Sequence, residues 1–143
     1  MSVLDRVQTD TRAAMKAGER DRVGVLRMLA SALQQDAKLG KDDEIAVLQR
    51  ERKKRLEAAE AYRAADRAEQ EGAERFEAGL IEAYLPAQLS DEELAALVEA
   101  AIVETGASER KQMGQVMAAL KPKVGGRADG KRISAAVRER LGA

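Results

Sequence analysis

The sequence predicts an all-helical protein, and three observations lead to this fold class. Alanine, arginine, glutamate, leucine and lysine supply 83 of the 143 residues, and these residue types suit a helix better than a strand. Apolar residues recur three and four positions apart, the spacing that places them on one face of a helix. No run of four or more residues alternates apolar and polar side chains as a half-buried strand does.

The first two predicted helices are delimited by residues that favour helix ends. Ser2 and Asp5 form a capping-box pattern at the start of a helix that Gly18 should end. Asp21 is the expected N-cap of a second helix, which should end at residues 39–40. Leucines at helical spacing form the buried face of that helix: Leu26, Leu29 and Leu33.

A third, long helix is predicted to start at Asp42 or Asp43 and to run to about residue 65. Asp66 is the expected N-cap of a fourth helix. That helix should end at Leu85, because a proline at position 86 disfavours helical backbone in the residue before it. Its apolar stripe consists of Phe76, Leu80 and Tyr84.

Three further helices are predicted after residue 89. Ser90 and Glu93 form a second capping box, and Gly106 should close the helix that follows. Ser108 is the expected N-cap of a short helix that Pro122 stops. A glycine-containing loop then leads to a last helix, whose apolar residues are four positions apart: Ile133, Val137 and Leu141.

These elements predict two domains. Residues 1–89 should form a domain of about four helices, some of them long. Residues 90–143 should form a compact three-helix domain, which is small but large enough to fold.

Missing residue types exclude several kinds of site. The chain has no Cys and no His, so thiolate nucleophiles, serine–histidine triads and sites ligated by Cys or His are excluded. We expect no catalytic residues, no cofactor and no metal. The chain also has no apolar run of the roughly 20 residues that cross a bilayer and no signal-peptide pattern at its start. A cytoplasmic protein without membrane contact is therefore expected.

The charges cancel in total but segregate along the chain. The sequence has 25 basic and 25 acidic residues. Residues 1–65 carry a net charge of +3, residues 66–105 carry −9, and residues 106–143 carry +6. Because salt screens charges over about 8 Å, the neutral total does not prevent the basic segment from binding nucleic acid. The acidic segment favours an alternative, a protein–protein adaptor that docks through its acidic helices.

Basic side chains surround the glycine-containing loop at residues 123–130. Glycines let a ligand approach the backbone closely, and the start of the following helix favours an anion. The basic residues that could reach one bound phosphate backbone are Lys121, Lys123, Arg127, Lys131 and Arg132. The alternative is an ordinary turn between helices in which Asp129 caps the last helix, and both interpretations hold together without conflict.

A second basic cluster occupies residues 50–55 of the third predicted helix. One interpretation is a solvated helix face with pairs four residues apart, Glu51 with Arg55 and Lys53 with Glu57. The other interpretation is a phosphate-binding stripe.

Five motifs, in order, resemble the YqeY proteins of the GatB/YqeY family; they occupy residues 26–29, 48–51, 84–90, 113–117 and 122–130. The chain from residue 90 onward is similar to the tail domain of the B subunit of the tRNA-dependent amidotransferase, which contacts the body of tRNA. The resemblance implies tRNA as a partner, with the amidotransferase or another translation protein as a second one. It does not imply the chemistry of the amidotransferase, because the chain has no room for the catalytic domain.

The resemblance also implies site residues. The positions that match the glycine and basic loop of the tail domain are Gly114, Lys123, Gly126, Arg127, Ala128, Asp129, Gly130 and Lys131. Lys111 stands where relatives often have an acid and adds one positive charge to the expected RNA face. The expected function is a non-catalytic, tRNA-binding accessory protein, associated through its family with a carbon–nitrogen ligase that uses glutamine as amide donor.

Overall fold

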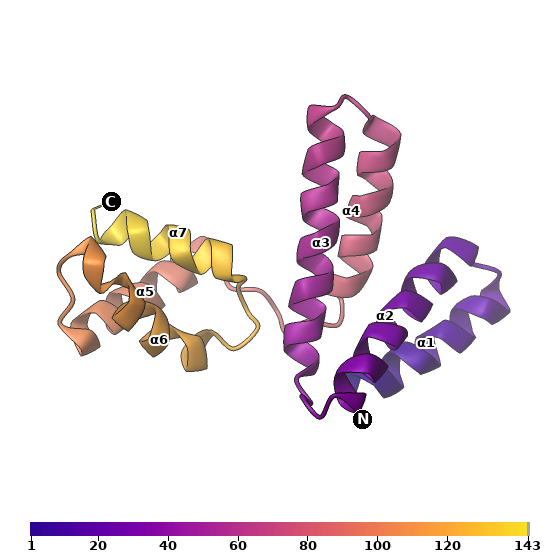
Figure 1. Ribbon diagram of the computed structural model, residues 1–143, viewed down its shortest axis with the longest axis horizontal. Coiled ribbons are helices and arrows are strands. Elements are labelled where there is room, and N and C mark those ends of the chain that lie inside the picture. The colour runs from indigo at the N-terminus through magenta and orange to yellow at the C-terminus, as the bar shows by residue number, and fades with distance from the viewer. Residues whose placement is uncertain (143) are drawn as a thin grey trace. The chain divides into compact units, whose positions relative to one another are not determined.

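A computed structural model describes residues 1–142 and confirms the all-helical fold (Figure 1). The chain divides into two compact units, Met1–Leu85 (the N-terminal unit) and Pro86 onward (the C-terminal unit). Among the described residues, no helix is both long and apolar enough to span a bilayer. Separate folding of two domains that meet between residues 89 and 90 stays a prediction.

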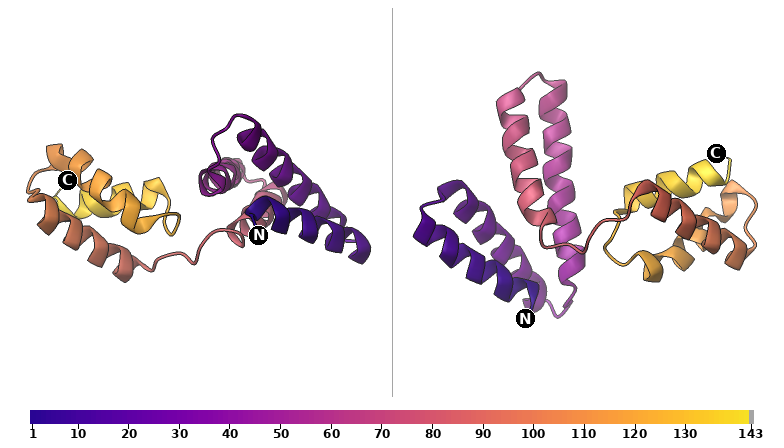
Figure 2. Two further views of the ribbon diagram at one scale, coloured as in Figure 1. Left: turned by 90° about the horizontal axis from the view of Figure 1, so that it is seen from below. Right: turned by 180° about the vertical axis from the view of Figure 1, so that it is seen from behind.

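The N-terminal unit consists of two antiparallel helix pairs (Figure 2). The first pair contains α1 (Val3–Ala17) and α2 (Arg20–Lys38), and the second contains α3 (Glu44–Ala64) and α4 (Ala68–Glu82). The first pair packs through facing apolar stripes, whereas the buried face of α3 also contains the charged residues Glu51 and Arg55. The largest fully buried side chains of this core are Leu26, Leu29, Leu48, Ile81, Val7 and Val47.

The start of α1 is capped twice. The predicted capping box is confirmed, with the Ser2 hydroxyl accepting from the Asp5 backbone N–H at 3.0 Å. In addition, the Glu44 carboxylate accepts from the backbone N–H groups of Val3 and Leu4, at 3.0 and 2.9 Å. A carboxylate at a helix N-terminus satisfies free N–H groups and complements the helix dipole. Glu44 therefore ties the first turn of α3 to the first turn of α1.

Replacing Glu44 with alanine should lower the free energy of unfolding by about 1–2 kcal/mol, because two backbone N–H groups lose their acceptor. Urea denaturation followed by circular dichroism measures the change. The matched control is Glu57→Ala, which removes a glutamate that is 68% exposed and pairs with Lys53 on the helix surface. An equal effect of both substitutions would contradict the capping role of Glu44.

Tyr84 lies two residues after the end of α4, which ends three residues earlier than predicted, and it contacts α1 through its ring and its hydroxyl. The hydroxyl donates a short hydrogen bond to the Asp10 carboxylate. The Arg6 guanidinium lies 5.2 Å from the centre of the ring, a distance at which a cation attracts the ring face. Burial, followed by the hydrogen bond and charge of Asp10, raises the pKa of Tyr84. The hydroxyl therefore stays protonated and keeps donating.

The C-terminal unit contains α5 (Asp91–Thr105), the 3-10 turn η1 (Arg110–Gln112), α6 (Met113–Val124) and α7 (Gly130–Arg140). The predicted capping box of Ser90 and Glu93 is confirmed. Gly106 ends α5 at a φ of 70°, a backbone conformation that glycine adopts without strain. The largest fully buried side chains in the core of the C-terminal unit are Val98, Val116, Leu120, Val124 and Val137.

Three predictions for the N-terminal unit are wrong. Asp21 is not an N-cap, because α2 starts two residues earlier than predicted, after Glu19, and lacks a side-chain cap. Asp66 is not an N-cap either; it takes a positive φ of 57° in the tight turn before α4, a conformation that aspartate tolerates. Phe76 is 49% exposed rather than buried, because α4 buries smaller residues such as Ala78 against its neighbours.

Two predicted helix ends in the C-terminal unit are also wrong. Ser108 does not cap a helix, because η1 intervenes and the Ser108 backbone N–H instead donates to the Gln112 side chain at 2.8 Å. Pro122 does not stop α6, which continues to Val124. Proline has a helical φ, but it lacks an N–H and its ring crowds the carbonyl four residues earlier; α6 extends only two residues beyond it.

Candidate nucleic-acid interface

The turn between α6 and α7 is held in place by the segment that precedes α5. The Leu89 backbone N–H donates to the carbonyl oxygen of Arg127 at 2.7 Å. The Gln88 side chain donates to the carbonyl oxygen of Gly126 at 3.0 Å. Ala128, which is buried, packs into the same core as Leu89. Two motifs that are distant in the sequence, residues 84–90 and 122–130, are thereby joined by hydrogen bonds.

The predicted cap at the start of α7 is confirmed. The Asp129 carboxylate accepts from the Arg132 backbone N–H at 2.8 Å, and Gly130 is the first residue of the helix. At the other side of the turn, Gly125 ends α6 with a positive φ of 57°. Gly114 does not belong to this turn, because it lies in the first turn of α6. The turn interpretation is therefore correct for the backbone.

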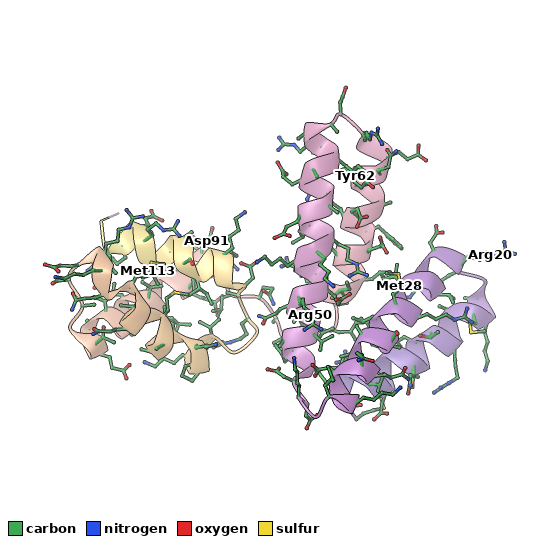
Figure 3. The ribbon with its side chains drawn as sticks, viewed as in Figure 1. Arg20, Met28, Arg50, Tyr62, Asp91 and Met113 are labelled. Atoms are coloured by element: carbon green, nitrogen blue, oxygen red, sulfur yellow. The ribbon has the colours of Figure 1, made fainter. Side chains whose placement is uncertain are left out.

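Two of the predicted phosphate-binding side chains form ion pairs with α5. Lys123 Nζ lies 2.6 Å from Glu104 Oε2. The Arg132 guanidinium lies 2.9 Å from Asp91 Oδ1, and it also donates to the carbonyl oxygen of Leu89 at 3.0 Å. Figure 3 labels Asp91 at the start of α5. Lys123 and Arg132 therefore hold α6 and α7 against α5, which makes them weaker candidates for a ligand.

A further ion pair, between Arg140 and Glu99, also joins α7 to α5. The hydrogen bond from Arg140 holds the pKa of Glu99 below its usual range. The sequence places acidic α5 and the basic residues after it in different segments, yet the fold brings them into contact. Part of the positive charge counted in residues 106–143 is consequently neutralised within the C-terminal unit.

Lys111 lies apart from the turn. It belongs to η1, and its ammonium group is 3.1 Å from the Glu109 carboxylate. The 12 residues of α6 separate η1 from the turn, a length of about 18 Å at the rise of an α-helix. The structure therefore does not bring Lys111 together with the basic residues at the turn.

Three predicted cations remain around the turn. Lys121 and Lys131 are exposed, and neither has a carboxylate within ion-pair distance in the part of the chain that the structure describes. Arg127 donates to the carbonyl oxygens of Val124 and Lys123, at 3.3 and 2.6 Å. A cation at the end of a helix complements the dipole, so Arg127 caps α6 and contributes its charge to the turn.

The charge of Arg127 acts on one nearby carboxylate, that of Glu93. Hydrogen bonds with the backbone N–H and hydroxyl of Ser90 hold the pKa of Glu93 below its usual range, and the charge of Arg127 adds to the effect. No ion pair forms between Glu93 and Arg127 among residues 1–142. The start of α5 therefore reduces the positive potential on one side of the turn without cancelling the charge of Arg127.

Sequence reasoning missed two exposed arginines. Arg110 lies in η1 and Arg138 in α7, and within the described residues neither has a carboxylate at ion-pair distance. Arg138 follows Lys131 by seven residues, two helical turns, so both side chains lie on the face of α7 opposite the buried Ile133 and Val137. This seven-residue spacing is the signal that could have added Arg138 to the predicted interface.

The basic cluster on α3 is used within the N-terminal unit. Both predicted pairs are confirmed: Arg55 with Glu51 at 2.9 Å and Lys53 with Glu57 at 3.9 Å. The face is not fully solvated, however, because the Arg55 side chain is only 7% exposed. The Arg52 guanidinium pairs across to Glu82 of α4 at 3.5 Å. These contacts favour a structural role for the cluster over a phosphate-binding stripe.

The amino-acid sequence matches the model of a known protein family. The family model described as Yqey-like protein matches residues 4–141, almost the whole chain. The chain belongs to the YqeY family. The match confirms the family resemblance of the five motifs, two of which meet at the turn between α6 and α7. A search of curated proteins finds no match. In residues 1–142 of this YqeY-family chain, no group of three or more acidic side chains is arranged to hold a metal ion.

Proposed function

We propose that the C-terminal unit binds the phosphate backbone of structured RNA, with tRNA as the expected class. The observation that carries this proposal is the set of exposed cations that α5 leaves unneutralised. These are Lys121 and Arg127 at the end of α6, and Lys131 and Arg138 on one face of α7. Together they present positive charge at the turn and along the neighbouring helix.

The chemistry of this surface suits backbone recognition. The chain has no Trp, one Phe and two Tyr, and none of the aromatic residues lies in the C-terminal unit, so bases have no ring on which to stack. Helical RNA is recognised mainly through its backbone and shape, whereas single strands require stacking. The sequence resemblance of residues 90–143 to a tRNA-contacting tail domain, which is itself an expectation from motifs, is the reason for choosing tRNA. Binding without turnover makes the protein an accessory factor.

Titration of labelled bulk tRNA with the full chain, followed by fluorescence anisotropy at several salt concentrations, tests the proposal. Each contacted phosphate should contribute about −0.7 to −0.9 to the slope of log K against log salt. The triple variant Lys121→Gln, Lys131→Gln, Arg138→Gln should therefore make the slope less negative by about 2–3. The ion pairs that hold the three helices together are untouched in this variant.

A matched control removes three positive charges elsewhere. The variant Lys53→Gln, Arg63→Gln, Arg67→Gln alters exposed side chains of the α3–α4 pair and has the same net charge as the test variant. It should retain the parental slope. No binding of tRNA at low salt, or equal slopes for the two variants, would refute the proposal. Recovery of a protein partner that survives nuclease treatment would instead favour an adaptor that docks through its acidic helices.

A further inference from the structure

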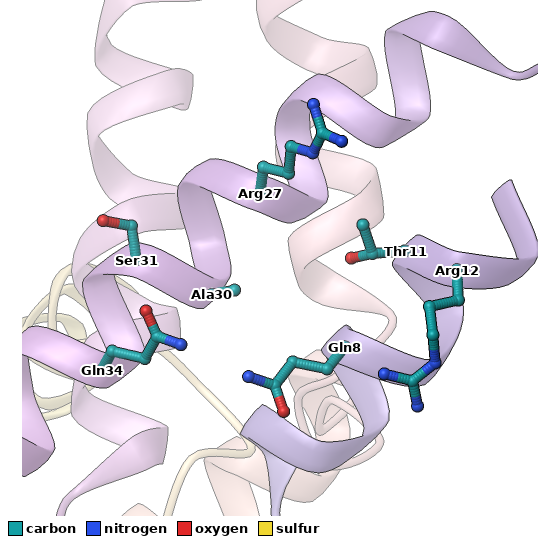
Figure 4. A pocket seen from close by; sticks show the side chains of 7 residues that line it. All are labelled: Gln8, Thr11, Arg12, Arg27, Ala30, Ser31 and Gln34. Carbon is teal, nitrogen blue, oxygen red and sulfur yellow. The ribbon is translucent and has the colours of Figure 1, made fainter. Parts of the chain in front are cut away.

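The N-terminal unit has an open groove between α1 and α2, on the side away from its core (Figure 4). The groove has a volume of about 460 Å³. Polar side chains from both helices line it: Gln8, Thr11 and Arg12 from α1, and Arg27, Ser31 and Gln34 from α2. Ala30 of α2 also lines the groove.

The two arginines of the groove differ from most arginines of this unit. Among residues 1–142, the polar contact of Arg12 is with the hydroxyl of Thr9, at 3.3 Å, and that of Arg27 is with the sulfur of Met15, at 3.6 Å. Neither has a carboxylate within ion-pair distance in residues 1–142. By contrast, Arg55 and other arginines of α3 and α4 pair with glutamates. Both groove guanidiniums therefore retain donors for a ligand.

The face of α2 beside the groove carries three widely spaced cations. Arg20 precedes Arg27 by seven residues and Lys38 follows it by eleven, spacings that return a helix to the same face. The residues between them on this face, Ser31 and Gln34, are uncharged. A row of cations without an interspersed acid attracts an extended anion rather than a single carboxylate.

We propose that this groove binds the phosphate backbone of the same RNA, as a second contact surface on the chain; the inference rests on the proposed function. Arginine, glutamine, serine and threonine are the side chains that contact phosphate and sugar oxygens in protein–nucleic acid complexes. The planar guanidinium can donate two parallel hydrogen bonds to one phosphate. The groove offers this combination from two facing helices.

A docked protein helix fits the groove less well. Helix-binding grooves take apolar anchor side chains into pockets lined by aliphatic or aromatic residues. Here the seven lining residues include no aromatic residue and no aliphatic residue larger than Ala30. The groove therefore supplies hydrogen-bond donors and positive charge without the apolar surface that a helix would bury.

Two separate contact surfaces on one chain have a measurable consequence. When one surface holds the RNA, the second binds it as an intramolecular event at a high effective concentration. Loss of either surface should then weaken binding of the full chain and reduce its salt dependence, while the remaining surface still binds. The two contributions can be measured separately because the groove and the turn lie in different units.

The test uses the full chain and labelled bulk tRNA, with the variant Arg12→Gln, Arg27→Gln. Affinity should fall about tenfold at about 100 mM salt, and the slope of log K against log salt should become less negative by about 1.4–1.8, the contribution of two phosphates. The control Arg63→Gln, Arg67→Gln removes two exposed charges from the same unit and should leave both quantities unchanged. Arg12→Lys, Arg27→Lys should retain the slope, because the charges remain.

The outcomes separate this inference from the proposed function. Parental binding by Arg12→Gln, Arg27→Gln overturns the groove as an RNA surface, whatever the turn variant does. A loss with this variant but none with the Lys121, Lys131 and Arg138 triple variant supports the groove and refutes the turn. Unchanged tRNA binding together with weakened binding of poly-glutamate would assign the groove to an acidic protein and overturn the inference.

Discussion

Replacing Leu120 with alanine should lower the free energy of unfolding of the C-terminal unit by about 2–5 kcal/mol. Leu120 is fully buried between α6 and its neighbours, in a core that otherwise contains mainly valine and alanine. Because a small unit buries little apolar surface, one leucine contributes a large share of its stability. Part of the cavity left by the side chain would remain, because the structure around such a truncation relaxes only partially.

Urea denaturation followed by circular dichroism measures this effect. The matched control is Val103→Ala on α5, where the side chain is 74% exposed and its truncation should change stability by less than about 0.5 kcal/mol. Equal effects of the two substitutions would contradict the assignment of the core. The same experiment tests the domain prediction, because Leu120→Ala should shift the unfolding of the C-terminal unit alone if the two units fold separately.

Replacing Arg55 with alanine should destabilise the N-terminal unit by about 3 kcal/mol, because the Glu51 carboxylate would remain largely buried without its closest partner. Arg55 donates to both the side chain and the backbone carbonyl of Glu51, at 2.9 and 3.0 Å. The two side chains are 7% and 11% exposed. The double variant Glu51→Leu, Arg55→Met should lie within about 1 kcal/mol of the parent, because removal of both charges leaves neither one buried alone.

The pH dependence of stability provides a second measurement for this pair. Burial alone would raise the pKa of Glu51, but hydrogen bonds from Arg55 and Lys54 outweigh it and hold the pKa below the ordinary value of 4.5. A carboxylate with a lowered pKa in the folded state stabilises the protein above its unfolded pKa, and this contribution is lost as the pH falls through the folded value. The stability difference between the parent and Glu51→Gln should therefore shrink below pH 4.5. A constant difference would contradict the prediction.

The features of the fold that the sequence predicted correctly depend on interactions between residues close in the chain. The capping boxes at Ser2 and Ser90, the glycine ends at Gly18 and Gly106, and the cap at Asp129 are all confirmed, because a cap depends on residues three positions apart. Some of the errors also have local causes. Asp66 adopts a left-handed conformation that aspartate allows as readily as a cap, and a sequence pattern cannot distinguish the two.

The candidate interface was less predictable, because charge acts through space. Lys123 and Arg132 are basic residues beside a glycine-containing turn, and nothing in their own segment marks them as partners of Glu104 and Asp91. The groove between α1 and α2 had no sequence signal at all. Its arginines matter because α1 and α2 bring Arg12 and Arg27 to one groove, and neither has a carboxylate within ion-pair distance among residues 1–142.

The amino-acid sequence by itself determined that this chain is helical, where most of its helices begin and end, and to which family it belongs, because propensity, caps and motif order are properties of neighbouring residues. Only the tertiary structure decided which basic side chains form ion pairs with α5 and which remain unpaired, since ion pairing depends on distances between helices. The same contacts joined residues 84–90 to the turn before α7. Long-range packing selects these neighbours, and a linear pattern does not contain that information.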